Sequence, residues 1–177
     1  MRPFLFSLLL LFTTTVSADS TAESFIKQNE GFKSKVYTCS AGKKTIGYGF
    51  THPSLIARGK MTESEANAAL RWYINEYRKV LNKYVKVSLN ANQEAVLLDF
   101  IHHFGEYNFR TSTLLKRLNS GDYRGVPYEL SRWVYQTKVN EKGRPVRDAR
   151  GRIIKVKING LINRAERRIE LWTDCKF

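Results

Sequence analysis

The spacing of apolar residues along the chain predicts a mostly helical protein. Apolar side chains recur every three or four positions over long stretches, which is the period of a helix with one buried face. The segments that carry this period are residues 20–29, 62–84, 90–101, 111–120, 127–134 and 159–172. Two of them open with capping-box pairs, Ser20 with Glu23 and Thr62 with Glu65. In the last segment, the residues expected on the buried face are Leu161, Ile162, Ala165, Ile169 and Trp172.

A different pattern separates the first two helices. Residues 36–38 and 44–50 are rich in β-branched and aromatic side chains, and residues 40–43 between them carry the turn-forming types that close a hairpin. The sequence therefore predicts a mainly helical α+β fold with one early hairpin. The long helix expected over residues 62–84 could join two lobes. We find no internal repeat in the pattern.

Residues 138–159 break the helical pattern. Glycines and a proline punctuate this segment, and residues 153–158 partly alternate as a strand does. The segment carries eight Lys or Arg residues against two acids. Two interpretations stay open, a basic hairpin that projects from the helical lobe or a solvated loop.

The N-terminus has the composition of an export signal. Arg2 provides a positive start, residues 4–12 are almost wholly apolar, and residues 16–18 have the small-x-small pattern of a cleavage site. We therefore predict a signal peptide over residues 1–18 and a protein that reaches the periplasm or the cell exterior. The alternative is an uncleaved membrane anchor, in which residues 13–15 extend the apolar run.

The rest of the chain, residues 19–177, has the length of one domain. Removal of the signal peptide takes away Arg2 and no acid, so the formal charge falls from +14 to +13. Such a charge favours an acidic partner over a merely solubilising role. Three acidic partners would explain the charge: nucleic acid, an anionic membrane surface, or an anionic polymer such as a bacterial envelope. Export makes nucleic acid the least suitable of them, and we expect the acidic surface of a bacterial envelope.

Three residues near the hairpin have a spacing that indicates chemistry. Glu30 ends the first predicted helix, Cys39 follows after eight intervening residues, and Thr45 follows after five more at the start of Thr-Ile-Gly-Tyr-Gly. This motif resembles that of the phage-type lysozymes of glycoside hydrolase family 24, which have a Glu, an Asp or Cys, and a Thr at these intervals. Further segments that resemble the family are residues 92–100, 109, 112–115, 118–121, 132–133 and 160–164.

The resemblance implies a lysozyme-like fold and a reaction. A small hairpin lobe and a larger helical lobe would be joined by the long helix, with a glycan cleft between them. The expected reaction is hydrolysis of the β-1,4 bond between N-acetylmuramic acid and N-acetylglucosamine in peptidoglycan. A monomer would carry it out, with no cofactor and no metal.

The resemblance also implies roles for individual residues. Glu30 would be the catalytic acid, with Arg164 paired to it, and Cys39 and Thr45 would activate or orient water. The residues expected to bind substrate are Tyr48, His103 and Thr113.

The chemistry of glycoside hydrolysis asks for such residues independently of the family. The acid must still carry its proton near neutral pH, and burial beside an apolar cleft raises the pKa of a Glu. A cation such as Arg164 lowers that pKa, so burial and the ion pair oppose each other, and the sequence leaves the outcome open. By composition alone, both Glu30 and Arg164 could be ordinary surface residues.

Cys39 stands where many phage-type lysozymes have Asp. A thiol has an unperturbed pKa of about 8.5, so it needs nearby cations, such as Lys43 and Lys44, to form the thiolate at neutral pH. The thiolate could then act as a base or as a soft nucleophile. The alternative is a structural disulfide with Cys175, which an exported protein can form.

The chain departs from the family pattern at two places. The His that usually follows Gly-x-Gly is Phe50, and the usual Phe-Asn pair before Gly105 is replaced by His102-His103-Phe104. Two adjacent histidines suggest a metal, but no third ligand has suitable spacing. A pair that lines the cleft or is hydrogen-bonded fits better.

Two rival functions share these features. One is a catalytically idle module that binds the envelope through the same fold and basic surface. The other is a cationic protein that disrupts membranes through residues 138–159. Lysis that depends on Glu30 would separate the enzyme from both.

Overall fold

The computed structural model describes residues 18–39 and 42–174, which form two groups of elements. The first group comprises α1 (Ala18–Glu30), β1 (Lys33–Thr38), β2 (Lys44–Gly47), α2 (Pro53–Ala57) and α3 (Glu63–Tyr84). The second comprises α4 (Ala91–Thr111), α5 (Thr113–Asn119), the short 3-10 helix η1 (Tyr123–Gly125), α6 (Val126–Ser131), β3 (Tyr135–Thr137), β4 (Lys155–Lys157) and α7 (Asn159–Thr173). The predicted signal peptide, apart from Ala18, lies outside the described residues. Within the described ranges, no helix combines the length and the apolar character that crossing a membrane requires.

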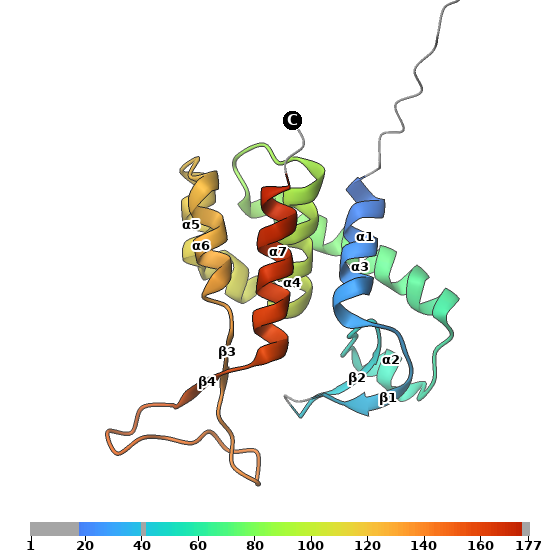
Figure 1. Cartoon of the computed structure of the whole chain (residues 1–177). Helices are drawn as coiled ribbons and strands as arrows, with labels where there is room; N and C mark the ends of the chain where they lie inside the picture. Colours follow the sequence, from blue (N-terminus) through green and yellow to red (C-terminus); the bar gives the residue numbers. More distant parts are fainter. Residues whose placement is uncertain (1–17, 40–41, 175–177) are drawn as a thin grey trace, which may run out of the picture.

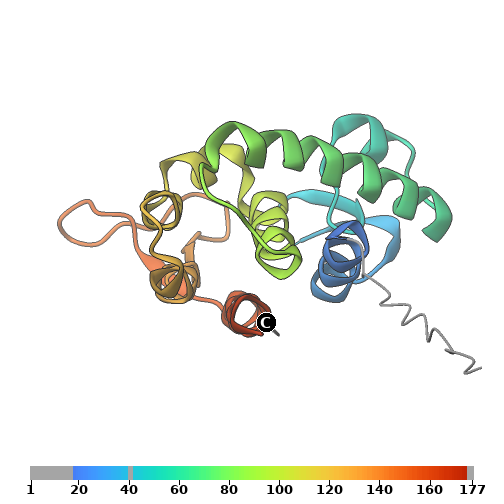
Figure 2. The ribbon, with the colours of Figure 1, turned by 90° about the horizontal axis from the view of Figure 1, so that it is seen from above.

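The elements are arranged as two lobes with a long helix beside them. The antiparallel hairpin β1–β2 and α2 form the smaller lobe, and α4 to α7 form the larger one (Figure 1). Seen from above, α3 runs along one side of the molecule from the first lobe to the second (Figure 2). This arrangement confirms the predicted mainly helical α+β fold with a joining helix.

Capping fixes where the two longest helices begin. Thr62 Oγ1 accepts a hydrogen bond from the Glu65 N–H (3.2 Å), and the Glu65 carboxylate accepts one from the Thr62 N–H (2.8 Å). Asn90 and Gln93 form a second reciprocal pair in front of α4. The predicted N-cap at Ser20 is wrong, because α1 already begins two residues earlier.

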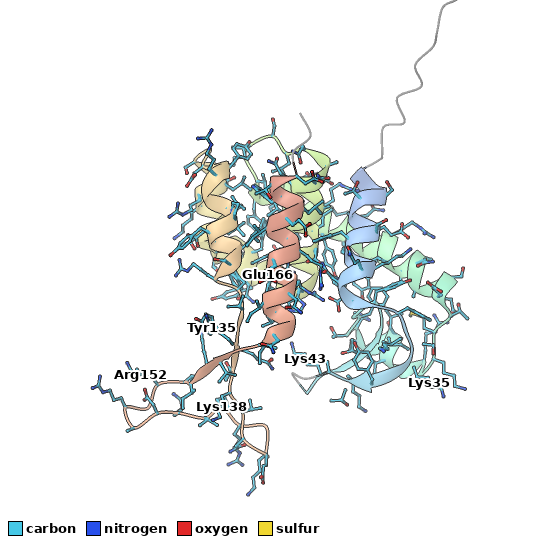
Figure 3. The ribbon with its side chains drawn as sticks, viewed as in Figure 1. Lys35, Lys43, Tyr135, Lys138, Arg152 and Glu166 are labelled. Carbon is cyan, nitrogen blue, oxygen red and sulfur yellow. The ribbon has the colours of Figure 1, made fainter. Side chains whose placement is uncertain are left out.

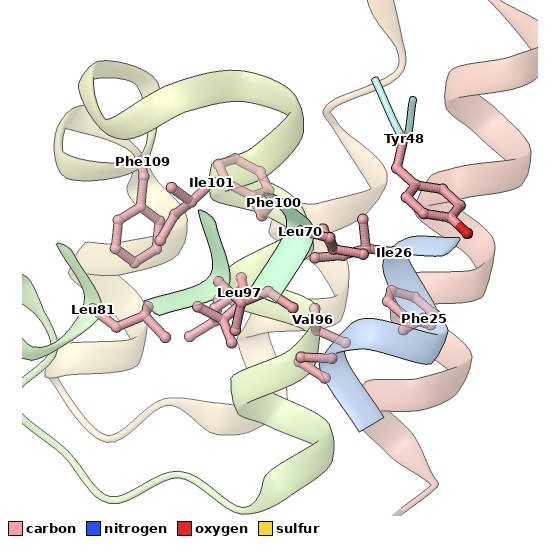
Figure 4. Close-up of a cluster of buried hydrophobic side chains, with 14 of the residues drawn as sticks. Phe25, Ile26, Tyr48, Leu70, Leu81, Val96, Leu97, Phe100, Ile101 and Phe109 are labelled. Carbon is pink, nitrogen blue, oxygen red and sulfur yellow. The ribbon is translucent and has the colours of Figure 1, made fainter. Parts of the chain in front are cut away.

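The hydrophobic core holds α1 against the larger lobe (Figure 4). Phe25 and Ile26 of α1, Leu70 of α3 and Leu97 of α4 are all buried within it. Burial of such aliphatic and aromatic side chains is the main favourable contribution to folding. Because α1 ends at this core, its last residue, Glu30, is held where the hairpin, α4 and α7 meet.

The buried face of α7 differs from the predicted one. Arg164 and Arg168 are buried, whereas Leu161, Ile162 and Ile169 are only partly buried. The other two predicted positions are buried as expected. A pattern of apolar residues cannot find buried arginines, because Arg is placed inside a protein only where the tertiary structure supplies an acidic partner.

The partner of Arg168 is Asp99 in the middle of α4. Arg168 Nε donates to Asp99 Oδ2 at 2.6 Å, and Arg168 Nη2 donates to the Asp99 carbonyl oxygen at 3.2 Å. The guanidinium also lies over the rings of Phe100 and Phe104, at 5.6 and 5.2 Å from their centroids. This pair fixes α7 against α4 from inside the larger lobe.

A basic arm, residues 135–157, leaves the larger lobe between α6 and α7 (Figure 1). Its base is the antiparallel pair β3–β4, in agreement with the hairpin interpretation. At its first tip, Asn140 Oδ1 accepts from the N–H groups of Lys142 (3.0 Å) and Arg144 (2.9 Å). The Asn140 N–H donates to the Arg144 carbonyl oxygen at 2.9 Å, and Gly143 supplies the positive φ (+72°) that closes the turn.

The second tip repeats this turn. Asp148 Oδ1 accepts from the N–H groups of Arg150 and Arg152, both at 2.9 Å, and the Asp148 N–H donates to the Arg152 carbonyl oxygen at 2.9 Å. The glycine at the fourth position again has a positive φ, +75°. Residues 140–144 and 148–152 therefore share the order Asn or Asp, any residue, Lys or Arg, Gly, Arg. The conclusion that the chain has no internal repeat is wrong for this arm, because a five-residue turn leaves no trace in a hydrophobic periodicity.

Asp99→Asn should destabilise the protein strongly, because it leaves the Arg168 charge buried without its counter-charge. We expect the free energy of unfolding in urea to fall by about 3–5 kcal/mol. Glu76→Gln, which removes the carboxylate of an exposed pair with Lys79, should cost less than about 1 kcal/mol. Equal losses in the two variants would contradict the anchoring role of Asp99.

Candidate active site

Glu30 is held at the end of α1 by two arginines of α7. Arg164 Nη1 donates to Glu30 Oε1 at 2.6 Å, and Arg164 Nη2 donates to the Asn29 carbonyl oxygen at 3.0 Å. Arg167 Nε donates to Asn29 Oδ1 at 2.6 Å. The Glu30 side chain retains 14% of its exposure, so it is mostly buried but can still be reached from solvent. Arg164 is therefore the partner of Glu30, as the resemblance implies.

His103 extends this network and is neutral in it. Its Nδ1 lies 2.6 Å from Arg164 Nη1 and 3.7 Å from Glu30 Oε1. Because a guanidinium only donates, Nδ1 must accept and the ring hydrogen must sit on Nε2. Burial, and then the charge of Arg164, keep the pKa of His103 below its usual range although Glu30 acts in the opposite direction. The His103 ring is 28% exposed and so remains accessible beside the carboxylate.

His102 fastens the hairpin turn to α4. Its Nε2 lies 2.9 Å from the Tyr48 carbonyl oxygen and its Nδ1 lies 3.2 Å from the Tyr77 hydroxyl. Since a carbonyl only accepts, Nε2 carries the hydrogen and Nδ1 accepts from Tyr77. The family pattern has a histidine directly after Gly-x-Gly. In this chain, a histidine of α4 contacts the turn instead. Phe50, which occupies that position, stacks on Tyr73 with centroids 5.1 Å apart. Both histidines are engaged in these contacts, and nowhere in the described ranges do three or more His, Cys, Asp or Glu side chains form a metal-binding group.

Gly49 lets the turn approach the carboxylate. Its φ is +84°, a conformation that L side chains rarely adopt. A Cβ at this position would lie 2.8 Å from Glu30 Oε2. The glycine of the motif is therefore needed for both the turn and the close approach.

One face of the hairpin carries Thr45 of the motif together with Tyr37. Tyr37 and Thr45 are directly paired across β1 and β2, so their side chains lie on the same face. Thr45 is buried and its hydroxyl donates to the Lys43 carbonyl oxygen at 3.1 Å, which leaves the hydroxyl lone pairs to accept a hydrogen bond.

Tyr37 is a site residue that the sequence analysis missed. Burial, followed by the negative charges of Glu30 and Cys39, raises its pKa, while Arg164 lowers it. Tyr37 therefore lies within electrostatic reach of all three groups. Strand register, with Tyr37 opposite Thr45, is the signal that could have found it.

Cys39 begins the turn of the hairpin. Its N–H donates to the Lys43 carbonyl oxygen at 2.9 Å, its carbonyl oxygen accepts from the Gly42 N–H at 2.8 Å, and Gly42 has φ +75°. These are the backbone bonds that Asn140 and Asp148 make at the two tips of the arm. Cys175 lies outside the described residues, so the proposed disulfide stays untested. The C-terminal end of α7 nevertheless points away from the hairpin (Figure 1).

The opposing influences on Glu30 have a clear balance. Burial alone would raise the pKa of Glu30, but the adjacent charge and hydrogen bond of Arg164 outweigh it and hold that pKa well below its usual range. In the protein without substrate, Glu30 is therefore a carboxylate near neutral pH.

Two of the predicted substrate-binding residues have other contacts. Tyr48 is only 2% exposed, and its hydroxyl donates to Glu63 Oε1 at 3.1 Å, so its side chain is a core residue and only its backbone faces the site. Thr113 begins α5, where its hydroxyl donates to the buried Glu129 carboxylate. Neither contact could be read from a one-dimensional motif. His103, in contrast, lies beside Glu30.

The chain is similar to known lytic proteins over most of its length. The sequence model of the phage lysozyme family matches residues 27–168. An endolysin of Acyrthosiphon pisum secondary endosymbiont phage 1 is 41% identical over 121 residues, which are 68% of this chain and 82% of the relative. A SAR-endolysin of Bacteriophage PS119 is 34% identical over 114 residues, 64% of this chain and 68% of the relative.

The fold also matches solved structures. The endolysin from Escherichia coli O157:H7 phage FAHEc1 superposes with a TM-score of 0.71 at 26% identity, over 90% of this chain and 95% of that one. The matched range includes Glu30, Cys39, Thr45 and Arg164, and the structure pairs Arg164 with Glu30. The chain belongs to the phage lysozyme family and is a muramidase-type glycoside hydrolase of peptidoglycan lysis.

Proposed function

We propose that this enzyme hydrolyses the β-1,4 bond between N-acetylmuramic acid and N-acetylglucosamine, with Glu30 as the catalytic acid. The observation that carries this proposal is the position of Glu30, which is mostly buried, fixed by Arg164 and placed against the Gly49 turn. A carboxyl group so restrained can face a glycosidic oxygen in one orientation, and such positioning accounts for a large part of catalysis.

Proton donation requires that substrate change the charge state of Glu30. In the substrate-free protein, the charge and hydrogen bond of Arg164 favour the carboxylate. A glycan chain over the 14% exposed side chain would exclude water, and loss of hydration disfavours the ionised form. We infer that binding of the glycan raises the pKa of Glu30, while Arg164 continues to orient the Glu30 carboxyl group.

The second half of the reaction needs a positioned water molecule. The Thr45 hydroxyl uses its hydrogen on the Lys43 carbonyl oxygen, so it would accept a hydrogen bond from that water and orient it. Cys39 supplies a thiol on the same hairpin, close enough to Tyr37 to influence the pKa of that tyrosine. A thiolate could take the proton of the water, as a carboxylate would.

The place of action follows from the N-terminus and the charge. Export by a signal peptide over residues 1–18 would deliver a monomeric enzyme to the periplasm or the cell exterior, and a SAR-endolysin is among the relatives. The formal charge of +13 that remains after removal of the signal peptide would concentrate the enzyme on the acidic envelope of its target.

Glu30→Gln should abolish hydrolysis of purified cell walls while the protein stays folded, because an amide keeps the shape but cannot donate the proton. Turbidity clearing should fall to a few per cent of wild type or less. Glu106→Gln, which changes an exposed glutamate of α4, should keep its activity. New reducing ends made by the wild type should be N-acetylmuramic acid; N-acetylglucosamine ends would exclude the proposed bond, and lysis by Glu30→Gln would favour the membrane-disrupting rival.

Stability should also report the charge of Glu30. A lowered folded-state pKa stabilises the protein at pH values above the unfolded-state pKa of about 4.3, and this contribution is lost as pH falls through the folded-state pKa. Wild type should therefore be more stable than Glu30→Gln by a constant amount above about pH 5, and the difference should shrink below about pH 4. Urea unfolding at a series of pH values measures this difference. A difference that grows on acidification would mean that the pKa of Glu30 is raised.

The role of Cys39 can be separated from the role of its turn. Cys39→Asp should stay active, since a carboxylate accepts a proton and Asp148 shows that Asp fits the first position of this turn. Cys39→Asn should form the turn equally well, because Asn140 occupies the same position in the arm. A neutral amide cannot act as a base, so wall clearing should drop at least about tenfold. Cys175→Ser is the control and should be silent. An active Cys39→Asn would assign Cys39 to the turn alone, and a Cys39–Cys175 cross-link in fully active protein would make the thiol structural.

A further inference from the structure

The basic arm is folded without a core of its own. No residue from 135 to 157 is buried, and the arm consists of paired backbone that extends away from the larger lobe (Figure 3). Two-stranded pairs of this kind are marginal in water unless something packs on them. Neither the fold nor the proposed hydrolysis at Glu30 uses this segment.

The repeated turn places cations at both ends of the arm. At each tip the third and fifth positions are cationic, Lys142 and Arg144 in one and Arg150 and Arg152 in the other. Arg152 is partly balanced, because its Nη2 lies 2.8 Å from the Asp148 carboxylate. Because the same turn occurs at both tips, the arm ends in two cationic tips.

Apolar side chains are exposed among these cations. Val139, Ile153 and Tyr135 are 49%, 43% and 49% exposed, and they make up half of the large hydrophobic residues exposed on the described surface. Val139 and Ile153 belong to the isolated bridges that lead into the two tips. A partner that is only an anionic polymer has no apolar surface against which these side chains could be buried.

One tip also borders an open hollow. It has a volume of about 670 Å³, and its lining combines three cations with two valines, one amide and one acid. Its lining is Lys138, Val139, Asn140, Glu141, Lys142, Arg144 and Val146. Cations beside aliphatic groups suit a phosphate attached to an apolar chain, and a phospholipid has this combination.

We propose that the basic arm is a membrane-docking surface that binds the headgroups of anionic phospholipids. Its cations contact the phosphates, the hollow at residues 138–146 takes a headgroup, and Val139, Ile153 and Tyr135 enter the interfacial region of the bilayer. The arm extends away from the larger lobe, so its tips are free to contact a surface (Figure 3).

The test is co-sedimentation of the full chain with vesicles of phosphatidylglycerol and phosphatidylcholine, compared with vesicles of phosphatidylcholine alone. The arm-charge variant replaces four cations that brace no turn with Gln, namely Lys138, Lys142, Arg144 and Arg150. Its matched control replaces four exposed cations of the helical lobe and α3 with Gln, namely Lys79, Lys86, Arg110 and Lys116. At low salt the arm-charge variant should bind on the order of a hundredfold more weakly, and the control should lose much less.

A second variant removes the apolar contribution at constant charge. Val139→Asn with Ile153→Asn should lose the part of vesicle binding that survives high salt, whereas Tyr107→Asn, at an exposed aromatic residue of α4, should keep it. Unchanged hydrolysis of wall fragments shows that each variant is folded. Equal binding to both kinds of vesicle would overturn the proposal, as would equal losses in the two charge variants. The proposal would also be overturned if the apolar variant bound vesicles like wild type. That result would mean that the arm recognises phosphate charge alone, as in a soluble phosphate polymer.

Discussion

The structure depends on the two ion pairs that α7 makes inside the molecule. Arg168 pairs with Asp99 of α4, and one turn earlier Arg164 pairs with Glu30 of α1. A buried guanidinium without a counter-charge costs several kcal/mol, so the two acids determine where α7 can lie. Both carboxylates come from helices that pack together through apolar contacts. The last helix thus joins the larger lobe to the end of α1, from which the hairpin starts.

The same constraint defines the chemistry. Arg164 holds the orientation of Glu30, but its charge also stabilises the carboxylate, which is the wrong form for a proton donor. The site therefore keeps Glu30 ionised until a substrate changes its surroundings. The ion pair that orients the carboxyl group also delays its protonation. His102 of α4 and Gly49 of the turn serve the same arrangement: His102 fastens the turn to α4, and Gly49 leaves room for the Glu30 carboxylate.

One turn geometry serves two purposes in this chain. In the arm it carries cations on a support with no core, and in the hairpin it begins at Cys39 and precedes Thr45. The first position of the turn is Asn140, Asp148 or Cys39. A side chain there can accept hydrogen bonds from the backbone of its own turn. The Asp or Cys of the lysozyme motif therefore stands at a position that turn formation and catalysis can both use.

The sequence by itself determined most of the helices, the hairpin and the spacing of Glu30, Cys39 and Thr45, because these follow from local periodicity, capping and motif. It also indicated the family and the partner of Glu30 through resemblance. It did not indicate the short helix α2 (Pro53–Ala57). Only the tertiary structure decided that α7 buries arginines, that the side chain of Tyr48 belongs to the core and that Tyr37 belongs to the site. It also decided the charge of Glu30. Burial and ion pairing depend on which residues meet from distant parts of the chain, and the two ion pairs of α7 join residues 69 and 134 positions apart. No local pattern contains that information.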